Sequence, residues 1–205
     1  LPPEQGAAEQ TMRILRVLGI DTHNKIPRLW IAENVKQRVT DMLAGEKLGT
    51  ARWISVNPFS RWSYKEWGEA KWMELLDWLW RSFAMPVVLV GSPEERPRVE
   101  ALIRQSGAKL INFAGRTTLA ELAGLLSQSA LHIGVDSAAP HIAAATGVPT
   151  LTIYGPSSWF DWLAPGEFHR IIEAQMDCVP CRQKGCDSRG VSRCLDELSV
   201  ESVKD

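Results

Sequence analysis

The chain has 205 residues, of which 45% are hydrophobic and 23% are charged, and its formal net charge at pH 7 is -1. Such a composition is typical of a globular protein with one large domain or two small ones, and a near-neutral charge argues against a nucleic-acid-binding surface. No run approaches the ~18 apolar residues of a membrane span, and no signal peptide is evident. We therefore expect a cytoplasmic protein that binds no nucleic acid.

Two helices are predicted near the start of the chain, over 11–20 and 33–49, with a linker-like stretch between them. The chain begins without Met, and it ends on a segment too short to form a stable isolated helix. We therefore expect it to be a piece of a longer protein.

From residue 52 onward, short apolar runs alternate with segments of helical periodicity. Strands are predicted at 52–56, 86–90, 109–114, 131–135 and 150–154. Helices are predicted at 66–83, 97–107 and 138–147, and a further helix begins at a capping box formed by Thr118 and Glu121, with Leu119, Leu122, Ala123 and Leu126 facing inward. Apolar strands that alternate with helices predict an α/β fold, a doubly wound parallel sheet of Rossmann-like type.

Polar, small or charged residues follow every predicted strand. In open parallel sheets, ligands bind beyond the carboxyl ends of the strands, so one site along that edge is predicted. The segments concerned are 57–61, 91–96, 115–118, 136–141 and 155–158.

The segment after the fourth strand predicts a phosphate site. Asp136, Ser137 and Ala138 lie where a strand runs into a helix, and small residues there expose backbone N–H groups at the positive end of the helix dipole. Ser137 adds a hydroxyl donor, and His141 lies one turn further along. The alternative is that small residues only allow close packing of the helix on the sheet, which accounts for the later alanines but not for Asp136, Ser137 and His141 together.

Two common phosphate-binding motifs are absent from the sequence. No GxGxxG follows a strand and no GxxxxGK[ST] occurs, so a dinucleotide cofactor and a P-loop are both disfavoured. A nucleotide-linked substrate that spans several loop ends remains.

The stretch DSAAPHIAAATGVPTLTIYGPSSWFDWLAP, at 136–165, resembles the signature of the ADP-heptose:lipopolysaccharide heptosyltransferases, glycosyltransferase family 9. That family has Asp-(Thr/Ser)-Gly-x-x-His before an Ala-rich helix, then a strand, Gly-Pro-(Thr/Ser) and Trp-x-x-Pro. Upstream, NPFSRWSYKEWGEAKW at 57–72 is similar to the family's hydroxyl loop and Lys-x-Trp segment, and the Cys-rich tail is more similar to the third core heptosyltransferase than to the first two. One departure is Ala138, where the family usually has Gly.

The resemblance implies one half of a GT-B glycosyltransferase, with residues 50–205 as its donor-binding Rossmann-like domain and 1–49 as linker and helical segments from the end of the N-terminal domain. Matched by position, Ser60, Arg61 and Lys65 would hold the diphosphate. Glu94 or Glu95 would face the nucleoside and Thr117 the adenine. The donor sugar and phosphates would contact Asp136, Ser137, Ala138 and His141.

The implied reaction is inverting transfer of heptose from ADP-heptose to the inner core of lipopolysaccharide. Lys65 and Asp136 are the catalytic candidates of this half, and Lys65, Arg61 and a helix N-terminus can stabilise the departing ADP without a metal or cofactor. The general base is expected in the N-terminal domain, so this chain alone should bind the donor without transferring the sugar. Any contact with the inner membrane would be peripheral, at its cytoplasmic face, and through that other domain.

All four cysteines lie near the C-terminus, at Cys178, Cys181, Cys186 and Cys194. The spacing could hold a structural zinc, or the residues could be reduced thiols or disulfides. We expect no metal in the site itself. Two alternative functions remain, a nucleotide-sugar epimerase of the GT-B fold and a non-catalytic nucleotide-binding module.

Overall fold

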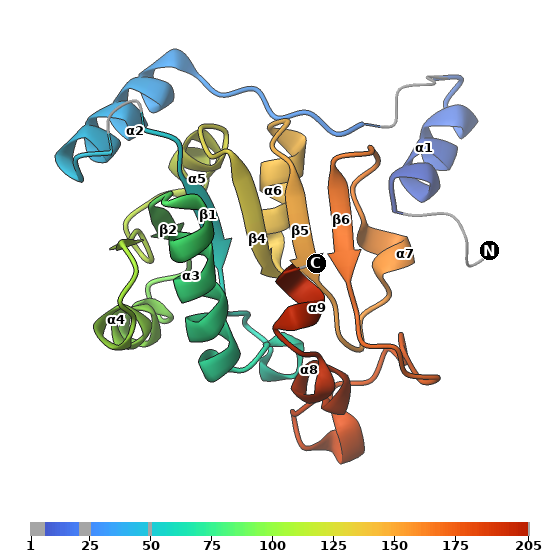
Figure 1. Cartoon of the computed structure of the whole chain (residues 1–205). Helices are drawn as coiled ribbons and strands as arrows, with labels where there is room; N and C mark the ends of the chain where they lie inside the picture. The colour runs from blue at the N-terminus through green and yellow to red at the C-terminus, as the bar shows by residue number, and fades with distance from the viewer. Residues whose placement is uncertain (1–6, 21–25, 49–50, 205) are drawn as a thin grey trace.

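Six parallel strands form a single sheet in the computed structural model, which describes residues 7–20, 26–48 and 51–204 (Figure 1). The strands lie in the order β3-β2-β1-β4-β5-β6. Their bounds are β1 (Ile54–Asn57), β2 (Val87–Leu89), β3 (Leu110–Asn112), β4 (Leu131–Val135), β5 (Thr150–Ile153) and β6 (His169–Ile172). This order is that of a Rossmann-like sheet, which confirms the predicted doubly wound fold.

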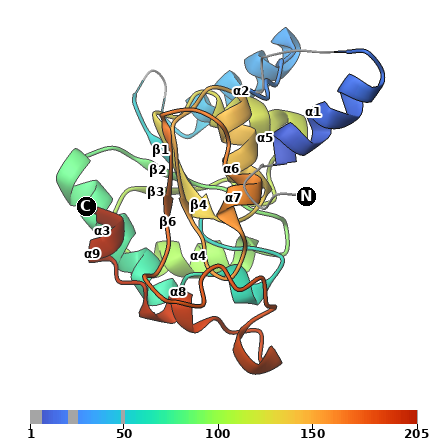
Figure 2. The same ribbon diagram turned by 90° about the vertical axis from the view of Figure 1, so that its right-hand side faces the viewer.

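Helices cover both faces of the sheet, which Figure 2 shows edge-on. One face packs against α3 (Glu69–Phe83), α4 (Arg96–Gln105), α8 (Arg193–Glu197) and α9 (Glu201–Lys204). The other packs against α2 (Glu33–Gly45), α5 (Leu119–Leu126) and α6 (Ala138–Ala145). The remaining elements are α1 (Ala7–Val17), α7 (Trp159–Trp162) and two short 3-10 turns, η1 (Ser63–Lys65) and η2 (Cys186–Ser188).

The strands form because their apolar side chains can be buried on both faces of the sheet at once. In β2 and the residue after it, Val87 and Leu89 belong to the core beneath α3, and Val88 and Val90 belong to the core beneath α5 and α6. This alternation follows the two-residue period of a strand and requires helices on both sides.

Several predicted elements agree closely with the structure. β4 has the predicted bounds, and α5 begins with the predicted capping box, in which the Thr118 side chain accepts from the Glu121 N–H. The predicted inward position of Leu119 is wrong: its side chain is 74% exposed, because it begins α5 at the rim of a pocket. The sequence analysis also missed β6 and the short helices α7 and α8. The short segment at the end of the chain forms α9, and Ser199 Oγ accepts from the Ser202 N–H at 3.2 Å.

Helix α2 packs against α5, and Val39 and Leu43 of α2 are buried in the same core as Leu125. Helix α2, which lies in the segment before residue 49, therefore contributes to this α/β body. The assignment of that segment to the end of a preceding domain stays a prediction, and residues 49 and 50 themselves lie outside the described part of the chain. Among the described residues, no helix is long and apolar enough to cross a membrane.

Candidate functional site

A pocket of about 640 Å³ opens where the chain leaves the carboxyl ends of β1 and β4. These two strands are neighbours in the sheet, and the connections from them lead in opposite directions, outward to β2 and β3 or to β5 and β6. Such a switch in strand order leaves a crevice at the carboxyl edge, which is where ligands bind in open α/β sheets. The predicted edge is therefore where the pocket lies.

Nine of the ten residues proposed for the donor site line this pocket: Ser60, Arg61, Lys65, Glu95, Thr117, Asp136, Ser137, Ala138 and His141. The tenth, Glu94, does not line it and is exposed on the loop surface. The loop at 155–158, also expected at the site, does not line the pocket.

The junction between β4 and α6 provides the expected helix N-terminus. Ser137 is the N-cap residue, with extended backbone (φ -150°), and its Oγ accepts from the Ala139 N–H at 3.4 Å. The same Oγ accepts from Asn57 Nδ2 at 2.8 Å. Ala138, the first helical residue, is exposed, so its small side chain leaves the first turn accessible from the pocket.

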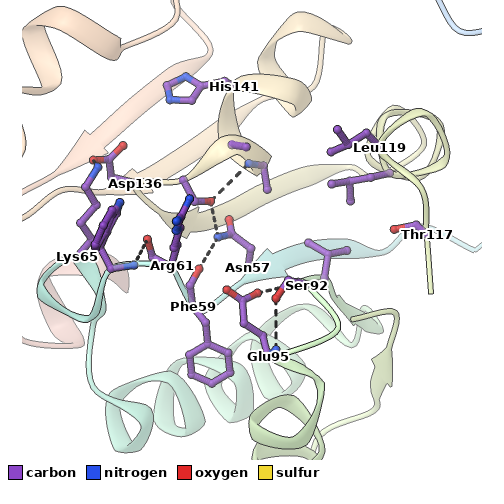
Figure 3. A pocket seen from close by; sticks show the side chains of 18 of the residues that line it. Asn57, Phe59, Arg61, Lys65, Ser92, Glu95, Thr117, Leu119, Asp136 and His141 are labelled. Carbon is purple, nitrogen blue, oxygen red and sulfur yellow. Dashed lines mark hydrogen bonds and ion pairs between the residues drawn. The ribbon is translucent and has the colours of Figure 1, made fainter. Parts of the chain in front are cut away.

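Lys65 and Asp136 form an ion pair in which Nζ lies 2.6 Å from Oδ2. The Asp136 side chain is 7% exposed and that of Lys65 is 22% exposed, so the lysine ammonium is the more accessible member. The carboxylate holds the Lys65 ammonium at the rim of the pocket, next to the N-terminus of α6 (Figure 3). The Lys65 ammonium and the N-terminus of α6 both favour negative charge in a ligand.

His141 lies on α6 and lines the pocket, above Asp136 in the view of Figure 3. Burial lowers the pKa of its imidazole below the usual value, while nearby Asp136 raises it and Lys65 lowers it. The ring is therefore mostly neutral at pH 7 in the free protein, and an anion beside it would favour its protonated form.

The loop after β1 is held by an ion pair that the sequence analysis missed. Glu66 accepts from the Ser60 N–H at 3.0 Å and from both terminal nitrogens of Arg98, at 3.0 and 2.8 Å. The Arg98 guanidinium also lies over the Phe59 ring, 3.8 Å from its centroid. These contacts fix the backbone that carries Ser60 and Arg61, and neither Glu66 nor Arg98 belongs to a motif that would have revealed them.

Thr117 and Leu119 lie at the end of the pocket opposite Lys65 and Asp136 (Figure 3). Glu95, between these ends, accepts from the Ser92 N–H at 2.8 Å, so part of its hydrogen-bonding capacity serves the loop after β2. Gly115 has φ +68°, and a Cβ there would lie 2.8 Å from the Pro93 Cα. Glycine at this position lets the loops after β2 and β3 approach closely.

The four cysteines lie together beside a second hollow of about 680 Å³. All four are free thiols, and burial raises the pKa of Cys194 to about 11. Within the described ranges, no group of three or more His, Cys, Asp or Glu is arranged to hold a metal. The structural-zinc hypothesis therefore stays a prediction without geometric support.

The cysteine segment also contacts the element that carries Lys65. Ser63 donates to the Gly190 carbonyl at 2.9 Å, and Ser192 donates to the Tyr64 carbonyl at 2.6 Å. Two hydrogen bonds therefore connect this segment to η1.

Known proteins place this chain in one family. A curated relative, the lipopolysaccharide heptosyltransferase 3 of Escherichia coli, is 28% identical over 167 residues, which are 79% of this chain and 48% of that protein. A solved glycosyltransferase family 9 structure from Veillonella parvula superposes with a TM-score of 0.81 at 22% identity, and the match covers 98% of this chain and 58% of that one. An Escherichia coli heptosyltransferase structure gives a TM-score of 0.58 at 21% identity, over 75% of this chain and 41% of that one.

The chain spans about half the length of the curated relatives that it matches first, at 48% and 45% of their sequences. The two structural matches are below 25% identity and support the fold. The sequence profile of glycosyltransferase family 9 (heptosyltransferase) matches residues 3–191. The chain therefore belongs to glycosyltransferase family 9, the heptosyltransferases.

Proposed function

We propose that this chain supplies the ADP-sugar-binding half of a GT-B enzyme that transfers heptose from ADP-heptose to the inner core of lipopolysaccharide, with inversion at the anomeric carbon. The observation that carries the proposal is the convergence of the α6 N-terminus, Ser137 and the Lys65 ammonium in one pocket at the sheet edge. The Escherichia coli heptosyltransferase structure matched above was solved with ADP-2-deoxy-2-fluoro heptose, which supports a donor of this type.

In this proposal the diphosphate lies against Ser60, Arg61 and Lys65 and the first turn of α6. Negative charge accumulates on ADP as the bond to the sugar breaks, and preorganised cations and N–H donors stabilise that charge. Lys65 supplies one cation, and Asp136 holds it in place. The proposal requires no metal or other cofactor for this step.

The nucleoside is assigned to the end of the pocket with Thr117 and Leu119, and Glu95, between the two ends, is assigned to face it. Asp136, Ser137, Ala138 and His141 are assigned to the donor sugar and phosphates. The acceptor and the general base are assigned to the other half of the enzyme, together with any peripheral contact with the inner membrane from the cytoplasm. No nucleic acid is assigned as a partner.

The epimerase alternative needs a pair of free carboxylates around the anomeric carbon. Asp136 and Glu95 are the carboxylates among the described residues that line the pocket. Asp136 is paired with Lys65, and Glu95 accepts from the Ser92 N–H. This pairing supports transfer over epimerisation.

The experiment is to titrate the chain with ADP, UDP and GDP. The melting temperature and the calorimetric affinity are measured for each nucleotide. ADP should raise the melting temperature most, since ligand binding to the folded state alone stabilises it. Equal shifts in melting temperature for the three nucleotides would reject the ADP-sugar assignment and would indicate a general nucleotide-binding module. No shift with any of them would reject the donor assignment.

A further inference from the structure

Buried polar side chains occupy one face of β1 and β4, directly beneath the pocket. Ser55 and His132 are fully buried, Asn57 is 3% exposed, and the register pairs Ser55 with His132 and Asn57 with Gly134. Strands covered on both faces normally carry apolar residues at such positions, as β2 does with Val88 on the same side of the sheet. Polar groups buried here must therefore satisfy one another.

These side chains form a continuous buried polar network, which we define as Ser129, Ser55, His132, Asn57 and Ser137. Ser129 Oγ lies 3.0 Å from Ser55 Oγ, which lies 2.9 Å from His132 Nδ1. His132 Nε2 lies 3.0 Å from Asn57 Oδ1, and Asn57 Nδ2 donates to Ser137 Oγ at 2.8 Å. The network thus runs from the core to the pocket, which Asn57 and the half-buried Ser137 both line.

The direction of the hydrogen bonds that Asn57 makes with Ser137 and His132 is fixed by one backbone carbonyl. Asn57 Nδ2 also donates to the Phe59 carbonyl, at 3.3 Å, and a carbonyl can only accept. The amide is thereby oriented, and its Oδ1 faces His132 and needs a hydrogen from Nε2. His132 is then the neutral Nε2–H tautomer, and its Nδ1 takes the single hydrogen of the Ser55 hydroxyl at 2.9 Å, in preference to the more distant Ser129 Oγ and Leu131 carbonyl.

The consequence for Ser137 concerns its own hydrogen. Its Oγ already accepts from Asn57 Nδ2 and from the Ala139 N–H, which uses both of its lone pairs. Within the described part of the chain, the Ser137 hydroxyl donates to no protein acceptor, and Ser137 lines the pocket. The hydroxyl can therefore donate to a ligand and is poorly suited to accept from one.

Gly134 shows how closely the network is packed. A Cβ at this position would lie 1.8 Å from Asn57 Oδ1 and 3.1 Å from His132 Nε2. Any larger residue would displace the Asn57 amide from its place between His132 and Ser137. Glycine is required here for the Asn57 position, without any unusual backbone conformation.

We propose that Asn57 and His132 are positioning residues that hold the Ser137 hydroxyl as a hydrogen-bond donor toward a phosphate oxygen of the ligand. This inference rests on the proposed function, since it takes the ligand to be a nucleoside diphosphate. Burial lowers the pKa of His132 to about 3, so the imidazole stays neutral near pH 7 and the direction of the network does not change there. The network selects for an acceptor, such as phosphate, at the Ser137 end.

The first test is a double-mutant cycle between Asn57→Asp and Ser137→Ala, with ADP and adenosine affinities measured by calorimetry. The new carboxylate would accept from the Ser137 hydroxyl and turn its hydrogen away from the ligand. We expect Asn57→Asp to weaken ADP binding about tenfold or more, and by less than about threefold in the Ser137→Ala background. Adenosine affinity should change little in any of these variants.

Asn112→Asp is the matched control. Asn112 ends β3, which lies two strands from β1, at the same carboxyl edge of the sheet. It lies outside the pocket lining, and among the described residues its Nδ2 has no hydrogen-bond partner. This variant adds the same charge without touching Ser137, so ADP affinity should stay within about twofold. Equal losses for Asn57→Asp with and without the Ser137 hydroxyl would overturn the positioning role.

The second test needs no substitution and no ligand. Nitrogen NMR of the unmodified chain at pH 7 should show His132 neutral with its hydrogen on Nε2 and with Nδ1 unprotonated. The Nδ1–H tautomer, or a protonated ring, would overturn the inference even if ADP binds. Failure of the unmodified chain to bind ADP would instead overturn the proposed function and the ligand part of this inference, with the tautomer unaffected.

Discussion

The two faces of β1 and β4 differ in what their residues do. On the face toward α3, Ile54 and Val56 of β1 and Ile133 and Val135 of β4 are apolar and buried in one core. On the face toward α5 and α6, the buried polar network of Ser129, Ser55, His132, Asn57 and Ser137 lies beneath the pocket.

The difference shows how one strand pair can contribute both to stability and to a site. Apolar burial is non-directional, so the face toward α3 stabilises the fold without setting the direction of any group in the pocket. Hydrogen bonds have direction, so the polar face transmits orientation from the core to Ser137. Substitutions on the two faces should therefore separate stability from ligand affinity.

The largest effect is expected on the apolar face. Ile133→Ala, at 2% exposure, should lower the free energy of unfolding by about 2–5 kcal/mol, because it removes buried methyl groups and leaves a cavity. ADP affinity of the folded protein should be unchanged, as urea unfolding and calorimetry can show. Leu151→Ala, at the half-buried partner position on β5, is the control and should cost less. A loss of ADP affinity in Ile133→Ala would contradict the claim that the apolar face affects stability alone.

The next effect concerns the cation at the pocket rim. Lys65→Met should weaken ADP binding by about 1.5–3 kcal/mol, since it removes a charge-assisted contact to phosphate, and it should leave adenosine binding nearly unchanged. The variant also leaves Asp136 buried without its partner, so the double variant with Asp136→Asn separates repulsion by the carboxylate from loss of the ammonium. Equal weakening of ADP and adenosine would assign Lys65 to structure alone.

The pH dependence of stability tests the polar face. The folded-state pKa of His132 is about 3, below the 6.5 of an unperturbed histidine, so the unfolded chain binds the extra proton between these values. The free energy of unfolding should therefore fall as the pH decreases below about 6.5, by up to about 1.4 kcal/mol per pH unit from this residue.

Burial also lowers the pKa of His141 and of His169, so both residues likewise lower the free energy of unfolding as the pH decreases. His132→Gln removes only the contribution of His132. The difference between the two proteins in how the free energy of unfolding depends on pH therefore isolates this contribution. A slope between pH 6 and 4 that is the same in both proteins would contradict a neutral, buried His132.

The smallest effect is expected at the first position of α6. Ala138→Gly should cost at most about 1 kcal/mol of stability, because glycine loses more backbone freedom on folding. ADP affinity should stay the same or improve, since the backbone N–H groups become more accessible. A clear loss of affinity, measured against adenosine, would indicate that the Ala138 methyl group itself contacts the ligand.

Much of the fold followed from hydrophobic periodicity, and the reasons for the failures are local. Short apolar runs and capping signals identified β4 and α5, because each had a continuous core-facing pattern. β6 was missed because His169 and Arg170 interrupt its apolar run at the edge of the sheet. Leu119 was predicted to face inward because helical period does not distinguish a core from the wall of a pocket.

The candidate site was predictable where it depends on loops that follow strands, as for Lys65 and Ser137. Asn57 begins the predicted loop 57–61, but its contact with His132 was not predictable, because the two residues are 75 positions apart and meet only through strand register. Within β4, His132 is a single polar residue among apolar neighbours, without a recognisable motif.

The central claim is that the β4–α6 junction binds the diphosphate of an ADP-sugar. The most direct measurement is ADP calorimetry on Ala138→Glu, with Ala120→Glu as the control. Both residues are exposed in the first turn of a helix, but only Ala138 lines the pocket. An acidic residue suits either helix dipole, so both variants should keep the melting temperature of the parent. The account predicts that Ala138→Glu no longer binds ADP while Ala120→Glu binds it normally, and undiminished ADP affinity in Ala138→Glu would contradict it.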